Sequence, residues 1–160
     1  MGFLEDLKFG KYYEKELLNY LDFDNYNICS ENENFKSWDI EIIKNNIKTS
    51  YEVKSDRIGY ITGNMAIEYE CNNKPSGITT TQSNYYAYFI INLIDYDLYI
   101  IPVDIIKLYI NTCKYKKSLN GGDGYKSKFY LFDIKTFKEY KRAKRKEEKN
   151  PNWTHTHTTH

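Results

Sequence analysis

The chain has 160 residues, of which 41% are hydrophobic and 28% charged, with a formal net charge of +1. This length predicts one domain with its own core, and the charge balance gives no global signature of nucleic-acid binding, although it does not exclude a local one. Three widely spaced cysteines, Cys29, Cys71 and Cys113, form neither a zinc pattern nor a disulfide framework, which favours a reducing interior.

Apolar periodicity and turn residues predict a mixture of helices and strands. Helical spacing covers residues 10–21, and a second helix is expected to begin with Asp104 as its cap and to run to residue 113. A short helix opened by a threonine is expected within residues 79–85, and a basic helix over residues 136–148. The expected strands are residues 26–29, the two strands that carry Asp39 and Glu52, and residues 65–69, 87–93, 98–103 and 128–132. The expected polar turns are residues 72–77 and 121–124.

No segment of the sequence has the features of a membrane span or a secretion signal. Residues 1–6 are too acidic for a signal peptide, and the longest apolar stretch, residues 85–93, is too short to cross a bilayer. We therefore expect a soluble intracellular protein with no membrane partner, in the cytoplasm or, for a viral protein, in the nucleus of a host.

Residues 1–150 are expected to form the single domain, and residues 151–160 lack periodicity and are expected to be a disordered tail. This tail contains all three histidines of the chain: His155, His157 and His160. Their spacing could capture a transition metal, but without folded residues to orient the imidazole rings we expect only incidental binding.

Two apolar runs, residues 38–43 and 47–54, are joined by a polar Asn45-Asn46 turn and predict a β-hairpin. Side chains alternate between the two faces of a strand, so Glu52 and Lys54 point to one side. Pairing across the turn would bring Asp39, on the neighbouring strand, near the level of Glu52. Two carboxylates and an ammonium group would then converge at one end of a sheet.

Such a convergence can be catalytic or merely solvated. Oxygen ligands of this kind suit Mg²⁺ or Mn²⁺, and a nearby ammonium group can orient a water molecule or offset charge on a phosphate. Acidic and lysine residues are common in this chain, however, so the alternative is a solvated strand face in which Lys54 forms a cross-strand ion pair. The order of the surrounding elements shifts the balance toward the catalytic interpretation.

The spacing D-x12-E-x-K, from Asp39 through Glu52 to Lys54, resembles the motif of the PD-(D/E)xK nuclease superfamily, although Trp38 stands where many members have proline. The predicted order of helix, three-stranded meander, helix and strand is similar to the core of that superfamily. Three further segments resemble parts of its members: Gly10-x-x-x-Glu14, Pro75-Ser76-Gly77-Ile78-x-Thr80 and Gln82-x-x-x-Tyr86. The resemblance implies an α/β, restriction-endonuclease-like core with a central mixed β-sheet flanked by helices.

The resemblance also implies a metal site. Asp39, Glu52 and the backbone carbonyl of Val53 would bind Mg²⁺, for which Mn²⁺ can substitute, and Glu14 would support the metal directly or through water. Glu14 and Glu16 are two residues apart on the helix and cannot share a face, and the Gly-x-x-x-Glu spacing favours Glu14.

For the substrate, the resemblance implies that Lys54 positions the attacking water or stabilises the transition state. Ser76, Thr80 and Gln82 would contact the substrate, with turn, cap and surface roles as their alternatives. Glu68 could be a further acid of the site or simply an exposed strand residue.

The predicted function is that of a Mg²⁺-dependent DNA endonuclease that hydrolyses phosphodiester bonds, on branched or recombining DNA in the manner of a resolvase. A homodimer is expected, because a symmetrical junction needs two active centres. Gln82 and Tyr86 mildly favour the alternative of an end-processing exonuclease. A further alternative is a non-catalytic nucleic-acid-binding protein on the same fold. The basic segment 136–148 would either grip flanking duplex or only cover the sheet.

Overall fold

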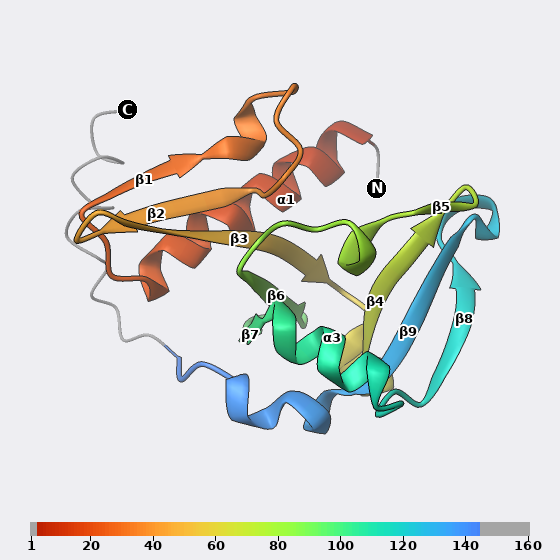
Figure 1. Cartoon of the computed structure of the whole chain (residues 1–160). Coiled ribbons are helices and arrows are strands. Elements are labelled where there is room, and N and C mark those ends of the chain that lie inside the picture. The colour runs from red at the N-terminus through yellow and green to blue at the C-terminus, as the bar shows by residue number, and fades with distance from the viewer. Residues whose placement is uncertain (1–2, 145–160) are drawn as a thin grey trace.

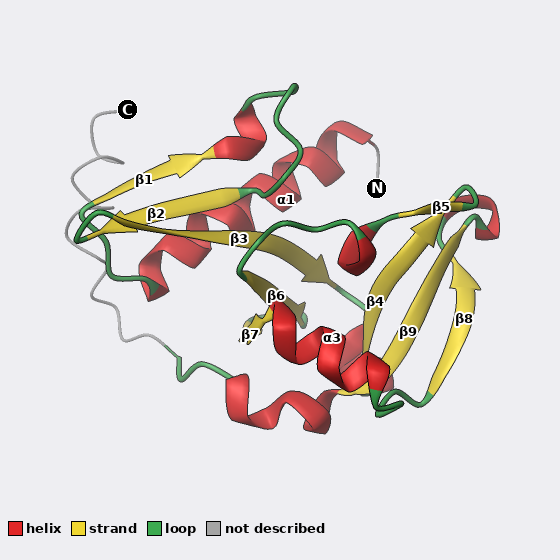
Figure 2. Cartoon of the chain, viewed as in Figure 1, coloured by secondary structure: helices red, strands yellow, loops and turns green. Residues whose placement is uncertain are grey.

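A computed structural model describes residues 3–144, which form two β-sheets and several helices (Figures 1 and 2). The first sheet is mixed and has the order β1-β2-β3-β6-β7; the second is antiparallel and has the order β5-β4-β9-β8. The strands of the first sheet are β1 (Asn25–Ile28), β2 (Ile40–Lys44), β3 (Ile47–Asp56), β6 (Tyr85–Ile91) and β7 (Tyr96–Pro102). Those of the second are β4 (Asn64–Cys71), β5 (Lys74–Pro75), β8 (Lys117–Gly121) and β9 (Ser127–Asp133).

The helices lie against these sheets and in the connections. The α-helices are α1 (Phe3–Leu17), α2 (Gly59–Thr62) and α3 (Val103–Asn111). The 3₁₀ helices are Leu18–Tyr20, Cys29–Glu31, Gly77–Thr79, Asp123–Tyr125 and Ile134–Tyr140. The predicted α/β class, with a mixed sheet flanked by helices, is confirmed.

The predicted hairpin is present as β2 and β3. Asn45 and Asn46 have φ angles of 50° and 62°, and Lys44 pairs with Ile47 across them. Two successive residues with positive φ define the type I′ turn that matches the right-handed twist of paired strands, and asparagine tolerates this conformation better than most residues. The Asn-Asn dipeptide therefore fixes the register of the whole hairpin.

Helix α1 covers one face of the first sheet. Its side chains Tyr13 and Leu17 are buried with Tyr51 of β3 and Phe89 of β6 in one apolar cluster. Full burial of a side chain such as Leu17 contributes about 1.5–3 kcal/mol. This packing holds α1 across the strands that carry the predicted site.

The opposite face of the first sheet packs against the second sheet and α3. On β6, Ala87 and Phe89 face the first apolar cluster. Tyr86 and Tyr88 alternate with them and belong to a second apolar cluster, together with Met65 of β4 and other residues. Strand β6 is therefore buried on both faces, as expected of a strand with a parallel neighbour inside a sheet.

The connection from β3 to β6 differs from the prediction. The helix expected within residues 79–85 is wrong: a single 3₁₀ turn, Gly77–Thr79, is followed by irregular chain up to β6. The crossover instead contains α2, β4 and β5. Two strands of the second sheet therefore come, along the chain, between β3 and β6, which are neighbours in the first sheet.

The expectations for the C-terminal half are partly wrong. Asp104 does not cap α3, because the cap residue is Pro102 and Asp104 lies in the first turn. Strand β8 was not expected, since its sequence, KSLNG, is polar and lies at a sheet edge, where charged residues discourage further pairing.

The basic segment matches the expected helix only in part. Residues Ile134–Tyr140 form two short 3₁₀ helices separated by a kink at Phe137, and Lys141 then bridges to Tyr99 of β7. Lys141 and Lys144 form ion pairs with Asp97 and Asp95, which favours a structural role for this segment. Residues 145–148 and the tail 151–160 lie outside the described residues.

No helix in the range 3–144 has the length and apolar character needed to cross a membrane.

Candidate active site

The site begins where β3 extends beyond β2. Asp39 immediately precedes β2, and its backbone amide donates to the Tyr51 carbonyl at 3.0 Å. Its side-chain Oδ2 accepts a hydrogen bond from the Val53 amide at 2.8 Å. The Asp39 carboxylate therefore takes the place of the backbone acceptor that a longer β2 would present to β3.

The Val53 carbonyl is directed to the same edge. The N–H and C=O groups of one strand residue point to the same side of the strand, so the Val53 carbonyl faces the side on which its amide binds Asp39. This direction agrees with the predicted role of the Val53 carbonyl as a ligand.

Glu52 and Lys54 lie on either side of Val53 in the sequence and share one face of β3. Lys54 Nζ lies 3.3 Å from Glu52 Oε2, and the Glu52 side chain is 21% exposed. The Lys54 ammonium also lies 5.9 Å from the centroid of the Tyr86 ring, which belongs to the residue paired with Glu52 on β6. The amine is thus placed between the carboxylate and an aromatic wall.

Burial raises the pKa of both Asp39 and Glu52. For Asp39, the Val53 amide and the Lys54 ammonium oppose the effect of burial on the pKa. For Glu52, Lys54 opposes it and the neighbouring Asp39 charge adds to it. Two buried carboxylates this close do not ionise together readily without a compensating cation.

Glu14 of α1 approaches the pair from the other side of the sheet edge. Its Oε1 accepts a hydrogen bond from Ser30 Oγ at 2.6 Å. Burial and, to a smaller extent, the charges of Asp39 and Glu52 raise the pKa of Glu14 to about 7, against the lowering effect of the Ser30 hydrogen bond. Glu16 points elsewhere and accepts a hydrogen bond from the Tyr96 hydroxyl at 2.6 Å.

The donor set fits Mg²⁺ in a particular way. Within residues 3–144, no group of three or more His, Cys, Asp or Glu side chains is arranged to hold a metal ion. The site instead offers the Asp39–Glu52 carboxylate pair and one carbonyl, with Glu14 acting at longer range. Mg²⁺ is often held by only one or two carboxylates, with waters and substrate phosphate completing its shell.

The predicted substrate residues are not gathered at this pair. Ser76 Oγ donates to Glu68 Oε2 at 3.0 Å, Thr80 Oγ1 donates to the Gly77 carbonyl at 3.5 Å, and Gln82 is exposed. Among the described residues, none of the three hydrogen-bonds to Asp39 or Glu52.

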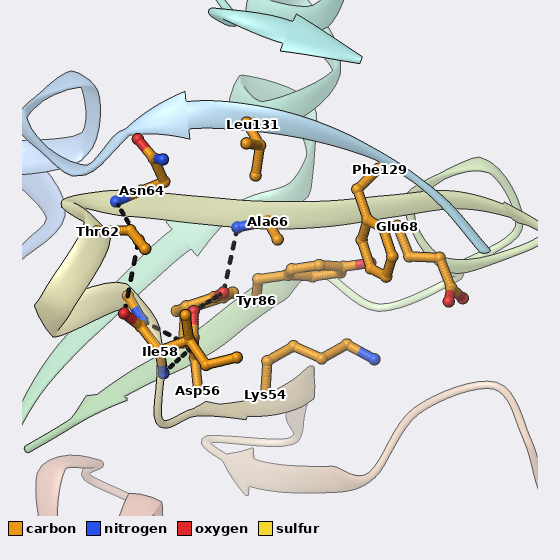
Figure 3. A pocket seen from close by; sticks show the side chains of 12 residues that line it. Lys54, Asp56, Ile58, Thr62, Asn64, Ala66, Glu68, Tyr86, Phe129 and Leu131 are labelled. Atoms are coloured by element: carbon orange, nitrogen blue, oxygen red, sulfur yellow. Dashed lines mark hydrogen bonds between the residues drawn. The ribbon is translucent and has the colours of Figure 1, made fainter. Parts of the chain in front are cut away.

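Glu68 and Tyr86 have a larger place in the site than their sequence context indicated. Both line a cavity with Lys54, and Figure 3 shows Lys54 and Glu68 extending toward the same end of it. Burial raises the pKa of Tyr86, and the negative charges of Glu52, Glu68 and Asp39 raise it further. The sequence carried no signal for this arrangement, because it depends on the pairing of β3 with β6.

No family model, curated protein or solved structure matches the chain.

Proposed function

We propose that this protein is a Mg²⁺-dependent DNA endonuclease of the PD-(D/E)xK type, with a restriction-endonuclease-like core, which hydrolyses phosphodiester bonds. The observation that carries the proposal is the convergence of Asp39, Glu52 and Lys54 at the point where β3 extends beyond the end of β2. The spacing of these residues in the sequence and the hairpin register that brings them together both agree with one chemistry.

In this proposal Asp39, Glu52 and the Val53 carbonyl hold Mg²⁺, or Mn²⁺ in its place. When bound, the ion lowers the pKa of a coordinated water and offsets the charge of the scissile phosphate. The Val53 amide engages Asp39 Oδ2 and so orients the carboxylate that would hold the ion. Because burial raises the pKa of both carboxyl groups, protons compete with the cation for this pair.

Lys54 acts on the phosphate or on the attacking water. Its side chain is 41% exposed and its ammonium is 3.3 Å from Glu52, so it can hydrogen-bond to an incoming oxygen without leaving the carboxylate. A positive charge fixed beside the developing negative charge stabilises the transition state. Glu14, with a pKa of about 7, would hold a water of the ion and exchange a proton near neutral pH.

The proposed substrate is branched or recombining DNA, cut by two copies of the chain. A symmetrical four-way junction contains two equivalent scissile strands, so paired incision needs two active centres. Sedimentation of the protein with and without a junction tests this stoichiometry.

A second candidate is a non-catalytic nucleic-acid-binding protein with the same fold. The observation that favours it is that the part of the chain described here has no ready group of three metal-ligating side chains. Such a protein would bind DNA with a steep salt dependence and would not cleave it with any metal.

The test is cleavage of a supercoiled plasmid and a labelled four-way junction in Mg²⁺, Mn²⁺ or EDTA. Wild type is compared with Lys54→Ala and with Lys48→Ala, a matched lysine on β3 that lies 3.4 Å from Glu41 instead of Glu52. We expect metal-dependent cutting that only Lys54→Ala abolishes. Cutting of linear but not circular DNA would indicate the exonuclease alternative, and no cutting by wild type would overturn the nuclease.

A further inference from the structure

A cavity of about 420 Å³ lies between the two sheets, directly beside the proposed catalytic group (Figure 3). Asp56 and Ile58, at the end of β3 and before α2, form one side, and Ala66 of β4 and Phe129 of β9 belong to the other. Lys54 lines the cavity as well. A group bound there is therefore adjacent to the phosphate on which Lys54 would act.

One wall of the cavity is apolar and aromatic without belonging to a core cluster. Phe129 and Leu131 are half-buried, yet among the described residues they belong to neither apolar cluster. They alternate along β9 with Tyr130 and Phe132, which pack with the second cluster. Figure 3 shows the Tyr86 ring extending toward Phe129 across this space. Nucleobases stack on aromatic surfaces of this kind.

The polar groups of the cavity divide into two kinds. The Asp56 carboxylate is fully engaged, because it accepts hydrogen bonds from the Ile58 amide at 2.7 Å, the Gly59 amide at 2.9 Å and the Tyr88 hydroxyl at 2.6 Å. These bonds hold Asp56 in place, so that it contributes to the shape of the cavity.

Tyr86 and Glu68 are the second kind. The Tyr86 hydroxyl makes no hydrogen bond to any residue in the range 3–144, and Ser76 holds only one carboxylate oxygen of Glu68, at 3.0 Å. A donor and an acceptor thus remain at the end of the cavity nearest Lys54, and the edges of nucleobases carry both donors and acceptors.

We propose that this cavity receives one unpaired nucleobase of the DNA strand that is cut, so that the protein prefers DNA with unpaired nucleotides to intact duplex. The inference rests on the proposed function for its class of substrate. A paired base can enter a recess between two sheets only by leaving its stack, and this step costs least for a mismatched or single-stranded base.

The test is DNA binding in EDTA, measured by fluorescence anisotropy with a labelled duplex that contains or lacks a single-nucleotide bulge. We expect wild type to bind the bulged duplex at least about 5-fold more tightly, the lower range for stacking of one base on an aromatic side chain. Phe129→Leu removes an aromatic wall and Ala66→Leu fills the space, and both should abolish the preference. Tyr130→Leu is the matched control, because this neighbour on β9 instead stacks on Tyr69, with ring centroids 4.2 Å apart.

Equal binding of the two duplexes by wild type would overturn the inference. So would a preference that persists in folded Phe129→Leu and Ala66→Leu proteins, with folding checked by thermal melting. Because one variant removes volume and the other adds it, loss of the preference in both supports the cavity as the base site. Parallel cleavage in Mg²⁺ separates the two proposals: equal cutting of both duplexes overturns the inference and leaves the nuclease, whereas a binding preference without cutting overturns the nuclease and leaves the base site.

Discussion

The Val53 amide donates a 2.8 Å hydrogen bond to the Asp39 carboxylate, so that a side chain continues the β2–β3 ladder one step beyond the end of β2. This contact makes Asp39 part of the sheet and at the same time leaves it at an open edge. A carboxylate fixed in this way needs little reorganisation to bind a cation, which is the property expected of a preorganised site.

Asp39→Asn should abolish cleavage while keeping the fold. The amide oxygen can still accept the Val53 hydrogen bond, but the negative charge that would hold Mg²⁺ is lost. We expect plasmid cleavage to fall by at least about 100-fold, as for loss of a key electrostatic group, with a melting temperature close to that of wild type.

Asp24→Asn is the control for Asp39→Asn, because Asp24 Oδ2 accepts a comparable hydrogen bond from the Asn45 amide, at 2.9 Å, at the other end of the hairpin. It should cleave like wild type. Unimpaired cleavage by Asp39→Asn would exclude Asp39 from the chemistry.

Mg²⁺ should stabilise the folded protein in a pH-dependent way. A tenfold excess of the ion over its dissociation constant contributes about 1.4 kcal/mol, or a melting temperature a few degrees higher. The effect should be larger at pH 8 than at pH 5, because protons compete for the Asp39–Glu52 pair, whose pKa values burial raises.

Glu52→Gln should remove most of this stabilisation by Mg²⁺, and Glu70→Gln, which loses an ion pair with Lys128 in the second sheet, should retain it. NaCl of equal ionic strength serves as the solvent control. An equal response of all three proteins would show that Mg²⁺ acts on the surface in general.

Glu14 should make the stability of the protein fall as the pH rises. Its pKa of about 7 in the fold lies above the ordinary value of 4.5, so the folded state favours the protonated carboxyl group. This contribution is complete below about pH 4.5 and is lost as the pH passes through 7. Melting temperatures of Glu14→Gln relative to wild type should therefore increase across this interval.

Ser30→Ala tests the cause of the Glu14 effect. The Ser30 hydrogen bond lowers the pKa of Glu14, so its removal should move the loss of stability to higher pH. A pH profile that is identical in wild type, Glu14→Gln and Ser30→Ala would contradict the assignment.

Gly77→Ala should destabilise the protein by more than about 1 kcal/mol. Gly77 has a φ of +52°, and an added Cβ would lie 2.2 Å from the Glu68 carbonyl oxygen, so either the turn or β4 must move. Gly10→Ala in α1, where nothing lies within 4 Å of the added Cβ, should instead stabilise by about 0.5–1 kcal/mol. Chemical denaturation of both variants measures the contrast, and equal stabilities would refute the close packing of Gly77 on β4.

The parts of the site that could be predicted are those encoded by short-range signals. The Asn45-Asn46 turn sets the β2–β3 register, and this register brings Asp39 opposite Glu52. Helical spacing placed Glu14 and Glu16 on different faces, and the Gly-x-x-x-Glu spacing favoured Glu14. The charges of Asp39 and Glu52 raise the pKa of Glu14, whereas Glu16 accepts a hydrogen bond from Tyr96. Whether these residues catalyse a reaction remains a prediction.

The parts that could not be predicted depend on long-range pairing. Tyr86 lies beside Glu52 because β6 pairs in parallel with β3, and Phe129 faces Glu68 because β9 pairs with β4. Neither pairing leaves a periodic pattern in the sequence. In the C-terminal segment, Phe137 and Tyr140 are spaced for either an α-helix or a 3₁₀ helix, and the sequence did not distinguish them.

The interruption of the first sheet by residues 57–84 has a consequence for the order in which the molecule assembles. The β2–β3 hairpin closes over a two-residue turn, whereas β3 and β6 can pair only after the whole excursion through β4 and β5 has been brought back. Closing the longer loop costs more chain entropy, and contacts distant in sequence form slowly. Asp39 and Glu52 are therefore expected to meet early in folding, and Tyr86 and the cavity wall late. A folding intermediate of this chain would carry the proposed chemical groups before it had the surface that selects a substrate.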